Sequence, residues 1–234
     1  IRDRYHPMVS KIGIVIPTAF NRPVYLPMAF DSISSQQGEF ELELIIACPQ
    51  EKVKAVKAAL PPRTRVIPES TETGLANKLD ALLKETSEDC DFLAWLGDDD
   101  ILTPGSLSAT MAALKSNPEA SMAYGACDYI DASGKVLFTN SNGEWASRIL
   151  RFGPQLIPQP GSLMRRKAFM ATGGLSNEFA LAFDFDLFLK LKRQGPFVFV
   201  NKTLAQFRWH PTSLSVKRRM RSALEASRVR RKYY

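Results

Sequence analysis

Apolar and polar positions follow two different rhythms along the chain. Continuous apolar runs such as residues 92–96 are typical of strands that are covered on both faces. Leu75, Leu79, Leu82 and Leu83 recur instead at the spacing of one helix face. These patterns predict strands at residues 11–16, 42–48, 65–67, 92–96, 122–130 and 136–138, and helices at residues 25–35, 51–60, 75–84, from 104 onward with Thr103 as N-cap, and from 183 to 195.

This alternation of strands and helices predicts an α/β fold, with a mostly parallel sheet that has helices on both faces. In such sheets, ligands bind beyond the carboxyl ends of the strands. Thr18, Asn21 and Arg22 follow the first expected strand, and three aspartates follow the strand at 92–96. Residues 143–160 contain proline and glycine without a regular pattern, and we expect them to form a loop over the same edge.

Length, hydrophobic content and cysteine number indicate which class of protein to expect. The chain has 234 residues, of which 45% are hydrophobic, and this fits one large domain. No apolar run approaches the ~18 residues of a membrane helix, and the first ten residues lack a signal-peptide core. The cysteines Cys48, Cys90 and Cys127 are odd in number and far apart, so we expect buried thiols, a reducing compartment and a cytoplasmic location.

Positive charge is concentrated near the end of the sequence. Residues 217–232 hold eight basic residues and one acid, Glu225, whereas the rest of the chain has 23 basic and 23 acidic residues. This basic tail, residues 217–234, is expected to be helical or partly disordered and to contact an anionic surface, most simply the inner membrane leaflet. Nucleic acid, an anionic substrate or simple solvation are the alternatives, and Arg218 and Arg219 could instead fold over a diphosphate.

Asp98, Asp99 and Asp100 are the strongest chemical signal. Adjacent carboxylates repel one another unless water or a cation screens them, and oxygen ligands suit Mg²⁺ or Mn²⁺. Such ions are commonly held by one or two carboxylates together with the phosphates of a substrate. We therefore expect a metal and diphosphate site at the end of this strand, with a polar turn as the alternative.

Two further aspartates open the helix expected at residue 183. Acidic residues in a first turn suit the helix dipole, so capping alone would account for them. Asp184 and Asp186 point about 200° apart on a helix, however, and cannot share one task. One of them can face a cleft while the other faces solvent or caps the helix.

Four segments, in this order, resemble family-2 glycosyltransferases with the GT-A fold. PTAFNR at residues 17–22 resembles the first nucleotide-binding loop, and LGDDDILTP at 96–104 resembles the metal-binding DxD segment. GGL at 173–175, followed by FDFDL at 183–187, resembles the acceptor-side segment that carries the catalytic base. RWHPTSLS at 208–215 resembles the segment that closes the site and supplies a histidine near the metal.

The resemblance implies a metal-dependent, inverting transfer of a sugar from a nucleotide-diphosphate sugar to a hydroxyl of a carbohydrate or lipid-linked acceptor. It implies a nucleotide-sugar half at about residues 9–130 and an acceptor half at about 131–216. The residues to which it gives roles are Asp184 as catalytic base; Pro17, Thr18, Asn21, Arg22, Lys78, Asp98 and Asp99 for the donor; Asp99, Asp100 and His210 for Mn²⁺ or Mg²⁺; and Gly173, Gly174, Asp186 and Trp209 for the acceptor.

Three features depart from the family pattern. Phe183-Asp184 stands where the family usually has a Glu-Asp pair, which leaves one carboxylate at the position of the base. The segment after the second strand, residues 47–50, lacks the acidic residues that commonly recognise the base. Gly97 stands where the family commonly has an aspartate. The donor nucleotide therefore stays open at this point.

The chemistry itself supports the same residue types. A divalent ion stabilises the charge that develops on a departing diphosphate, and an acceptor hydroxyl needs a positioned base. Two other classes stay open. A nucleotidyltransferase would use a similar sheet and metal carboxylates, but no Gly-rich basic loop follows the first strand. A nucleic-acid-binding protein would explain the basic tail, but three aspartates would repel a phosphate backbone, so nucleic acid is not the expected partner.

Overall fold

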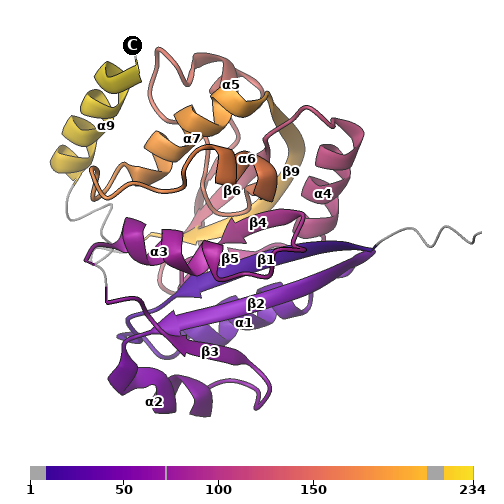
Figure 1. Cartoon of the computed structure of the whole chain (residues 1–234), viewed down its shortest axis with the longest axis vertical. Helices are drawn as coiled ribbons and strands as arrows, with labels where there is room; N and C mark the ends of the chain where they lie inside the picture. Colours follow the sequence, from indigo (N-terminus) through magenta and orange to yellow (C-terminus); the bar gives the residue numbers. More distant parts are fainter. Residues whose placement is uncertain (1–8, 72, 210–218, 234) are drawn as a thin grey trace, which may run out of the picture.

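One sheet forms the centre of the protein (Figure 1). The computed structural model describes residues 9–71, 73–209 and 219–233. Within these ranges the strand order is β3-β2-β1-β4-β8-β6-β9-β5, and β7 pairs with β6. The strands are β1 Ser10–Pro17, β2 Phe40–Cys48, β3 Arg65–Pro68, β4 Phe92–Trp95, β5 Ile101–Leu102, β6 Met122–Ile130, β7 Val136–Asn140, β8 Leu163–Arg165 and β9 Phe197–Arg208.

The first half of the sheet is parallel, as the alternating pattern predicts. β1 lies between β2 and β4, so that Ile14 is opposite Leu44 on one side and Ala94 on the other. All of β4, Phe92–Trp95, is buried, which confirms that its continuous apolar run is covered on both faces. The carboxyl ends of β1, β2 and β4 therefore meet at one edge of the sheet.

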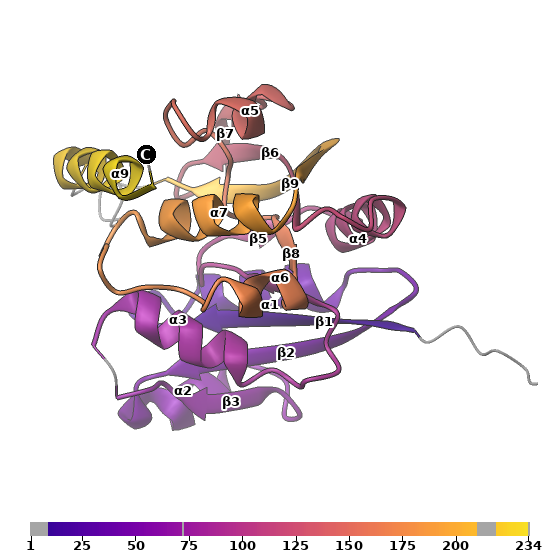
Figure 2. The same ribbon diagram turned by 45° about the horizontal axis from the view of Figure 1, so that its top comes forward.

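Helices cover both faces of the sheet (Figures 1 and 2). Ile12, Ile14 and Ile16 pack in one core cluster with residues of α1, α2 and α4, whereas Val15 packs in the other with α3, α6 and α7. The helices are α1 Tyr25–Ser34, α2 Val53–Ala58 after the 3-10 turn Gln50–Lys52, α3 Leu75–Lys84, α4 Ser106–Ser116, α5 Trp145–Ile149, α6 Arg166–Ala171, α7 Phe183–Gln194 and α9 Arg219–Tyr233.

The second half of the sheet contains elements that the sequence pattern did not predict. β8 pairs antiparallel with both β4 and β6, and β9 pairs parallel with β6 over most of its length. The pairing between β6 and β9 shifts register after Gly125, because Gly125 pairs with Val200 whereas Ala126 pairs with Thr203. This irregularity interrupts the alternation of β9, which explains why a twelve-residue strand gave no clear signal. The stretch 143–160, expected to be a loop, contains the short helix α5.

The start of α4 corrects one prediction. The helix begins at Ser106, with Gly105 in a left-handed conformation as its N-cap residue, and not at Pro104. Thr103 is not its cap, because its hydroxyl lies 2.5 Å from the carbonyl oxygen of Thr203 in β9 and donates to it. The hydrogen bond from Thr103 to the carbonyl of Thr203 therefore replaces the expected capping bond to the helix.

The basic end of the chain is helical, as predicted, but it is not a separate tail. Val229 and Glu225 of α9 are buried against the body, whereas Met220 and Leu224 are 77% and 60% exposed. The apolar residues of this helix therefore divide between two faces. Among the described residues, no helix combines the length and the apolarity that crossing a membrane requires. Cys48, Cys90 and Cys127 are buried free thiols, as expected.

Candidate active site

The loop that follows β1 is held against its neighbouring strand ends by a threonine. Pro17 ends β1, and the backbone N–H of Thr18 donates to the carbonyl of Ala47 in β2 over 2.8 Å. The Thr18 hydroxyl accepts the N–H of Phe20 (2.9 Å) and donates to Oδ2 of Asp98 (2.5 Å). Phe20 has a φ of 51°, a left-handed turn that non-glycine residues rarely adopt. The loop therefore joins the ends of β2, β1 and β4.

The three aspartates after β4 have different surroundings. Asp98 and Asp99 are half-buried, whereas Asp100 is only 4% exposed. A guanidinium nitrogen of Arg22 lies 2.9 Å from Oδ2 of Asp99. The backbone N–H of Arg208 donates to Oδ1 of Asp100 over 3.0 Å. The structure thus brings Thr18, Arg22 and the aspartates together, and it turns Asp100 toward the interior.

The glycine before the aspartates makes room for that inward turn. A Cβ atom at Gly97 would lie 2.7 Å from Oδ2 of Asp100 and 3.3 Å from Oδ1 of Asp99. The first of these distances is too short for any real side chain. The departure from the family pattern at position 97 is therefore coupled to the buried position of Asp100.

Burial and mutual repulsion disturb the acidity of this cluster. Burial raises the pKa of Asp98, and the charge of Asp99 adds to the rise, although the hydrogen bond from Thr18 opposes it. Burial together with the same neighbouring charge raises the pKa of Asp100 to about 8. A cation beside these oxygens would offset both effects, and carboxylate oxygens are ligands that Mg²⁺ and Mn²⁺ accept. The donor set therefore fits the expected divalent ion.

Arg208, the last residue of β9, is a central residue of the site that received no role from the sequence. It is 1% exposed, and its Nε donates to the backbone carbonyl of Asp99 over 3.0 Å. Its Nη1 donates to the carbonyl of Asp131 (2.9 Å), and its guanidinium lies 4.4 Å from the ring centroid of Tyr25. Its Nη2 has no hydrogen-bond partner among the described residues. The only sequence signal for it was its place at the start of the RWHPTSLS segment.

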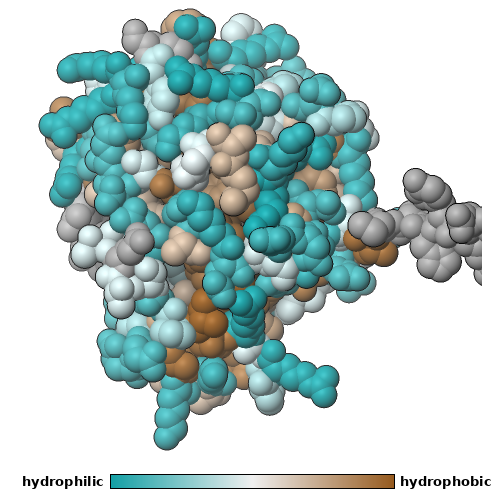
Figure 3. All heavy atoms as spheres, viewed as in Figure 1, coloured by the Kyte–Doolittle hydropathy of each residue, from teal (hydrophilic) through white to brown (hydrophobic). Residues whose placement is uncertain are grey.

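A groove of about 190 Å³ lies between α3 and β3, and its lining includes Ala47, whose carbonyl accepts the N–H of Thr18 in the loop after β1. Apolar surface is visible over β2 and β3 in Figure 3, and Ala47, Ile67 and Leu82 belong to the groove lining. Lys78, expected to contact the donor, forms a 2.6 Å ion pair at the groove with Glu69. The N–H of Glu69 donates to the carbonyl of Cys48, which places this acid beside the end of β2. Glu69 therefore places a carboxylate at the groove, beside the end of β2 and residues 47–50.

A larger cavity of about 540 Å³ surrounds Asp184. This aspartate opens α7 and accepts a hydrogen bond from Nε2 of Gln155 over 2.9 Å. Burial raises the pKa of Asp184, and the Gln155 hydrogen bond opposes the rise. Tyr129, Phe138 and Trp209 line one wall, where the Tyr129 and Phe138 rings stack at 4.4 Å and Trp209 meets Phe138 edge-on at 5.9 Å. Such aromatic walls are suited to the apolar faces of a sugar.

The Asp184 cavity adjoins the aspartate cluster. Gln159 lines the cavity and donates to the backbone carbonyl of Trp95, the last residue of β4, over 3.0 Å. Burial raises the pKa of Tyr129, and the charges of both Asp100 and Asp184 contribute to that rise. The aspartate cluster and Asp184 are therefore close enough for both to interact electrostatically with Tyr129.

Asp186 faces away from this cavity, as the helical spacing required, but it does not face solvent. It is fully buried, with Lys190 at 2.8 Å and the hydroxyl of Tyr233 donating to Oδ1 over 2.7 Å. The C-terminal helix α9 covers it. Asp186 thus joins α7 to α9 and is not among the residues that line the Asp184 cavity.

Other predicted residues lie at the margins. Gly173 and Gly174 both have positive φ angles and form a turn. The N–H of the next residue, Leu175, donates to the carboxylate of Asp80 in α3 over 2.8 Å. A Cβ on Gly174 would lie 2.0 Å from that Asp80 carboxylate, and neither glycine lines the cavity. Asn21 is exposed on the loop after β1. His210 lies outside the described residues.

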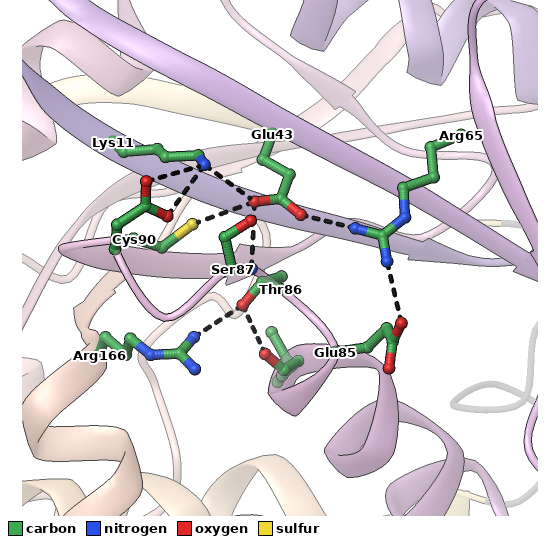
Figure 4. Close-up of polar contacts among 10 residues, drawn as sticks. Lys11, Glu43, Arg65, Glu85, Thr86, Ser87, Cys90 and Arg166 are labelled. Carbon is green, nitrogen blue, oxygen red and sulfur yellow. Dashed lines mark hydrogen bonds and ion pairs between the residues drawn. The ribbon is translucent and has the colours of Figure 1, made fainter.

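A second acidic cluster lies at the opposite, amino-terminal edge of the sheet (Figure 4). Glu43, Asp89 and Cys90 are the described residues whose potential ligand atoms come within 4.8 Å of one another. Figure 4 shows the Lys11 ammonium beside Glu43 and Cys90, with Arg65 on the other side of Glu43. The Lys11 ammonium lies 3.4 Å from Glu43 and 2.9 Å from Asp89, and Arg65 lies 2.7 Å from Glu43. The carboxylates of this cluster are thus paired with cations, and the cluster links β1 and β2 with the residues that precede β4.

Comparisons with known proteins agree with this geometry. The family model described as glycosyl transferase family 2 matches residues 14–173. An uncharacterised glycosyltransferase of Haemophilus influenzae is 24% identical over 212 residues, which cover 88% of this chain and 70% of the relative.

Solved structures of S. aureus TarS are similar in fold. Its fragment 1–349 matches with a TM-score of 0.64 both as the UDP-GlcNAc complex (14% identity, 87% of this chain) and as the UDP complex (15% identity, 94% of this chain). The chain spans 60% and 64% of the length of those two structures. The mixed sheet and its helical layers match this GT-A-like architecture, and the chain belongs to glycosyltransferase family 2.

Proposed function

We propose that this glycosyltransferase moves a sugar from a nucleotide-diphosphate sugar to an acceptor hydroxyl, with inversion at the anomeric carbon and with help from Mn²⁺ or Mg²⁺. The observation that carries the proposal is the adjacency of two carboxylate regions with different surroundings. Asp98 and Asp99 stand with Arg22 at the ends of β1 and β4, and Asp184 lines an aromatic cavity beside them. The first region can hold the ion that stabilises a departing diphosphate, and the second can supply the base that a hydroxyl nucleophile needs.

On the donor side, the α3–β3 groove fits a nucleobase. Its lining combines apolar side chains with the Glu69–Lys78 pair, and a carboxylate there can accept an imide N–H from uracil. The UDP complexes of the structurally similar TarS support the same class of nucleotide. We therefore propose a uridine diphosphate sugar, with Glu69 taking the part of the acid that residues 47–50 lack.

Asp98 and Asp99 are the proposed holders of the divalent ion, because both are partly exposed beside the loop of Thr18. When bound, the ion would stabilise the charge that develops on the diphosphate. Asp100 is buried and accepts the backbone N–H of Arg208, so its proposed task is to hold the aspartate loop in place. Arg22 adds a positive charge that can move from Asp99 to a phosphate oxygen.

Asp184 is the proposed general base. As the acceptor oxygen bonds to the anomeric carbon, the bond from that carbon to the diphosphate oxygen breaks and its electron pair leaves with the diphosphate. The hydroxyl proton passes to a carboxylate oxygen of Asp184. The raised pKa of this buried group makes it a better proton acceptor than an exposed aspartate.

A nucleotide-binding measurement tests the donor half of this proposal. UDP should stabilise the wild-type protein against heat in the presence of Mn²⁺ and much less in EDTA, because ligand binding raises stability by mass action. Asp99→Asn should remove most of the Mn²⁺-dependent shift. Asp89→Asn, at the opposite edge of the sheet, is the matched control and should keep it. Equal shifts in both variants would refute the assignment.

We also propose that the outward face of α9 contacts an anionic membrane, where a lipid-linked or polymeric acceptor would be met. Arg221, Arg228 and Arg231 are exposed on this helix together with Met220 and Leu224. Each basic residue near an anionic bilayer contributes about 1 kcal/mol. Cosedimentation with anionic vesicles should fall in Arg228→Gln/Arg231→Gln, and binding equal to that of the wild type would refute the contact.

A further inference from the structure

A second cavity, which none of the roles above uses, lies between α5, α7 and the end of α9. It measures about 580 Å³. The C-terminal end of α9 lies near α5 and α7 at one end of the molecule in Figure 1. The lining includes Arg148 and Arg151 from the segment of α5, Lys192 and Arg193 from the last turn of α7, and Tyr233 from α9. Two segments far apart in the sequence thus bring their cations to one place, and α9 adds an aromatic ring.

The charged side chains that the structure describes around this cavity are of one sign. Among the described residues, the lining carries four cationic side chains and no carboxylate. Glu144 pairs with Arg148 over 3.1 Å, but both side chains are about two-thirds exposed, so the pair contributes little. Burial lowers the pKa of Lys192, as expected for an ammonium taken out of water without a carboxylate beside it. An anion in the cavity would offset that desolvation.

Aromatic rings hold several of these cations in place. The guanidinium of Arg193 lies 4.8 Å from the ring centroid of Tyr233, and that of Arg151 lies 5.2 Å from the ring of Phe152. The Lys192 ammonium lies 5.1 Å from the ring of Phe197. Guanidinium groups present paired N–H donors that match phosphate oxygens, and an ammonium adds a point charge. The arrangement therefore suits a phosphate group better than a neutral sugar.

This basic cavity and the Asp184 cavity are joined along two paths. On α9, Ala226 lines the Asp184 cavity and Tyr233 lines the basic one, a distance of about 10 Å at 1.5 Å per residue. Along the loop before β8, Phe152 lines the basic cavity and Gln155 lines the Asp184 cavity, and three residues of chain span at most about 10 Å. Arg230 of α9 donates to the carbonyl of Gly153 over 3.3 Å and ties the two paths together.

We propose that the basic cavity is an acceptor subsite that binds a phosphate group of the acceptor while the reacting hydroxyl lies at Asp184. This inference rests on the proposed transfer reaction and adds the chemical class of the acceptor, namely a phosphate-bearing molecule. The phosphate can belong to a soluble chain or to the headgroup of a lipid, and both present the same oxygen atoms to the cations.

Binding of tripolyphosphate to the full chain, measured by calorimetry in EDTA, tests the subsite apart from the metal-dependent donor edge. Arg151→Gln/Lys192→Gln should weaken binding about tenfold or more. Lys54→Gln/Lys57→Gln removes two exposed cations from α2 and is the matched control, which should change binding less than twofold. Mn²⁺-dependent binding of UDP to the same proteins reports the proposed donor site separately, so a failure there is distinguishable from a failure of the subsite.

Cosedimentation with vesicles of phosphatidylglycerol, compared with phosphatidylcholine, separates the two sources of phosphate. Loss of vesicle binding in Arg151→Gln/Lys192→Gln without any tripolyphosphate binding would assign the site to a lipid headgroup. Tripolyphosphate binding that depends on the same two residues would assign it to a soluble phosphate chain. Equal weakening in both double variants, or wild-type protein that binds neither probe, would overturn the proposal.

Discussion

The proposed donor edge and the proposed acceptor side of this glycosyltransferase are built in different ways. The donor edge is made of short segments that directly follow β1 and β4, and its contacts, such as Thr18 to Asp98, join neighbouring strand ends. The acceptor side is assembled from β6, β9, the loop before β8, the first turn of α7 and α9. Parallel strands bring their ends together by topology alone, whereas the acceptor cavity depends on packing between distant segments.

This difference means that the two sides should respond differently to substitution. Changes at the donor edge should act on nucleotide binding, whereas changes around α7 and α9 should act on transfer. Arg208 is the exception, because it comes from β9, on the proposed acceptor side, and holds the aspartate loop of the proposed donor edge.

The largest expected effect on stability is therefore at Arg208. Arg208→Leu leaves the carbonyls of Asp99 and Asp131 without their donors and removes a cation beside buried Asp100, so unfolding free energy should fall by about 3–5 kcal/mol. Urea denaturation measures this change. Lys202→Leu, on the same strand, removes an exposed bond to the carbonyl of Pro104 and should cost less than about 1 kcal/mol. Similar losses in both variants would contradict a special role for Arg208.

The second-largest effect is expected at Glu225, on the proposed acceptor side. Glu225 of α9 is buried and accepts the N–H groups of Leu181 (2.7 Å) and Ala182 (3.3 Å), which lead into the helix of the proposed base. Glu225→Gln keeps one acceptor oxygen but loses the charge, and the cost should be about 1–2 kcal/mol together with a lower kcat. Glu178→Gln, which removes an exposed partner of Lys232, is the control and should change neither by much. An unchanged kcat in Glu225→Gln would contradict the expectation that α9 positions the helix of the proposed base.

The smallest effect concerns the pH dependence of transfer. The base must be ionised, and burial raises its pKa, so kcat/KM should rise with pH through an inflection above the ordinary aspartate value of about 4. Gln155→Leu removes the hydrogen bond that lowers the pKa of Asp184, and the inflection should move to higher pH. Gln159→Leu changes the same cavity without touching Asp184 and should leave the inflection in place. A shift to lower pH in Gln155→Leu would contradict this account.

Sequence patterns were informative where contacts are local. The apolar run of β4 and the leucine face of α3 identify their elements, and the three aspartates mark the edge that the parallel strands create. The same reasoning separated Asp184 from Asp186 by helical geometry, and the structure places them in different surroundings.

Long-range packing explains what the sequence could not show. The register shift near Val200 interrupts the alternating pattern of β9, so the sequence predicted neither this strand nor the position of Arg208. Glu225 and Tyr233 belong to a stretch whose composition indicates a basic tail, yet their side chains reach Leu181 and Asp186. Nothing in their own neighbourhood in the sequence indicates these partners.

The most direct test of the account compares donor binding with transfer in Asp184→Asn. This variant should bind UDP with Mn²⁺ about as tightly as the wild type, because Asp184 lies in the acceptor cavity and not among the residues of the groove or the aspartate loop. Its rate of sugar transfer should fall by a factor of about 10²–10⁴, the contribution of a general base. Transfer at the wild-type rate, or a loss of UDP affinity as large as the loss of rate, would contradict the separation of the two sides.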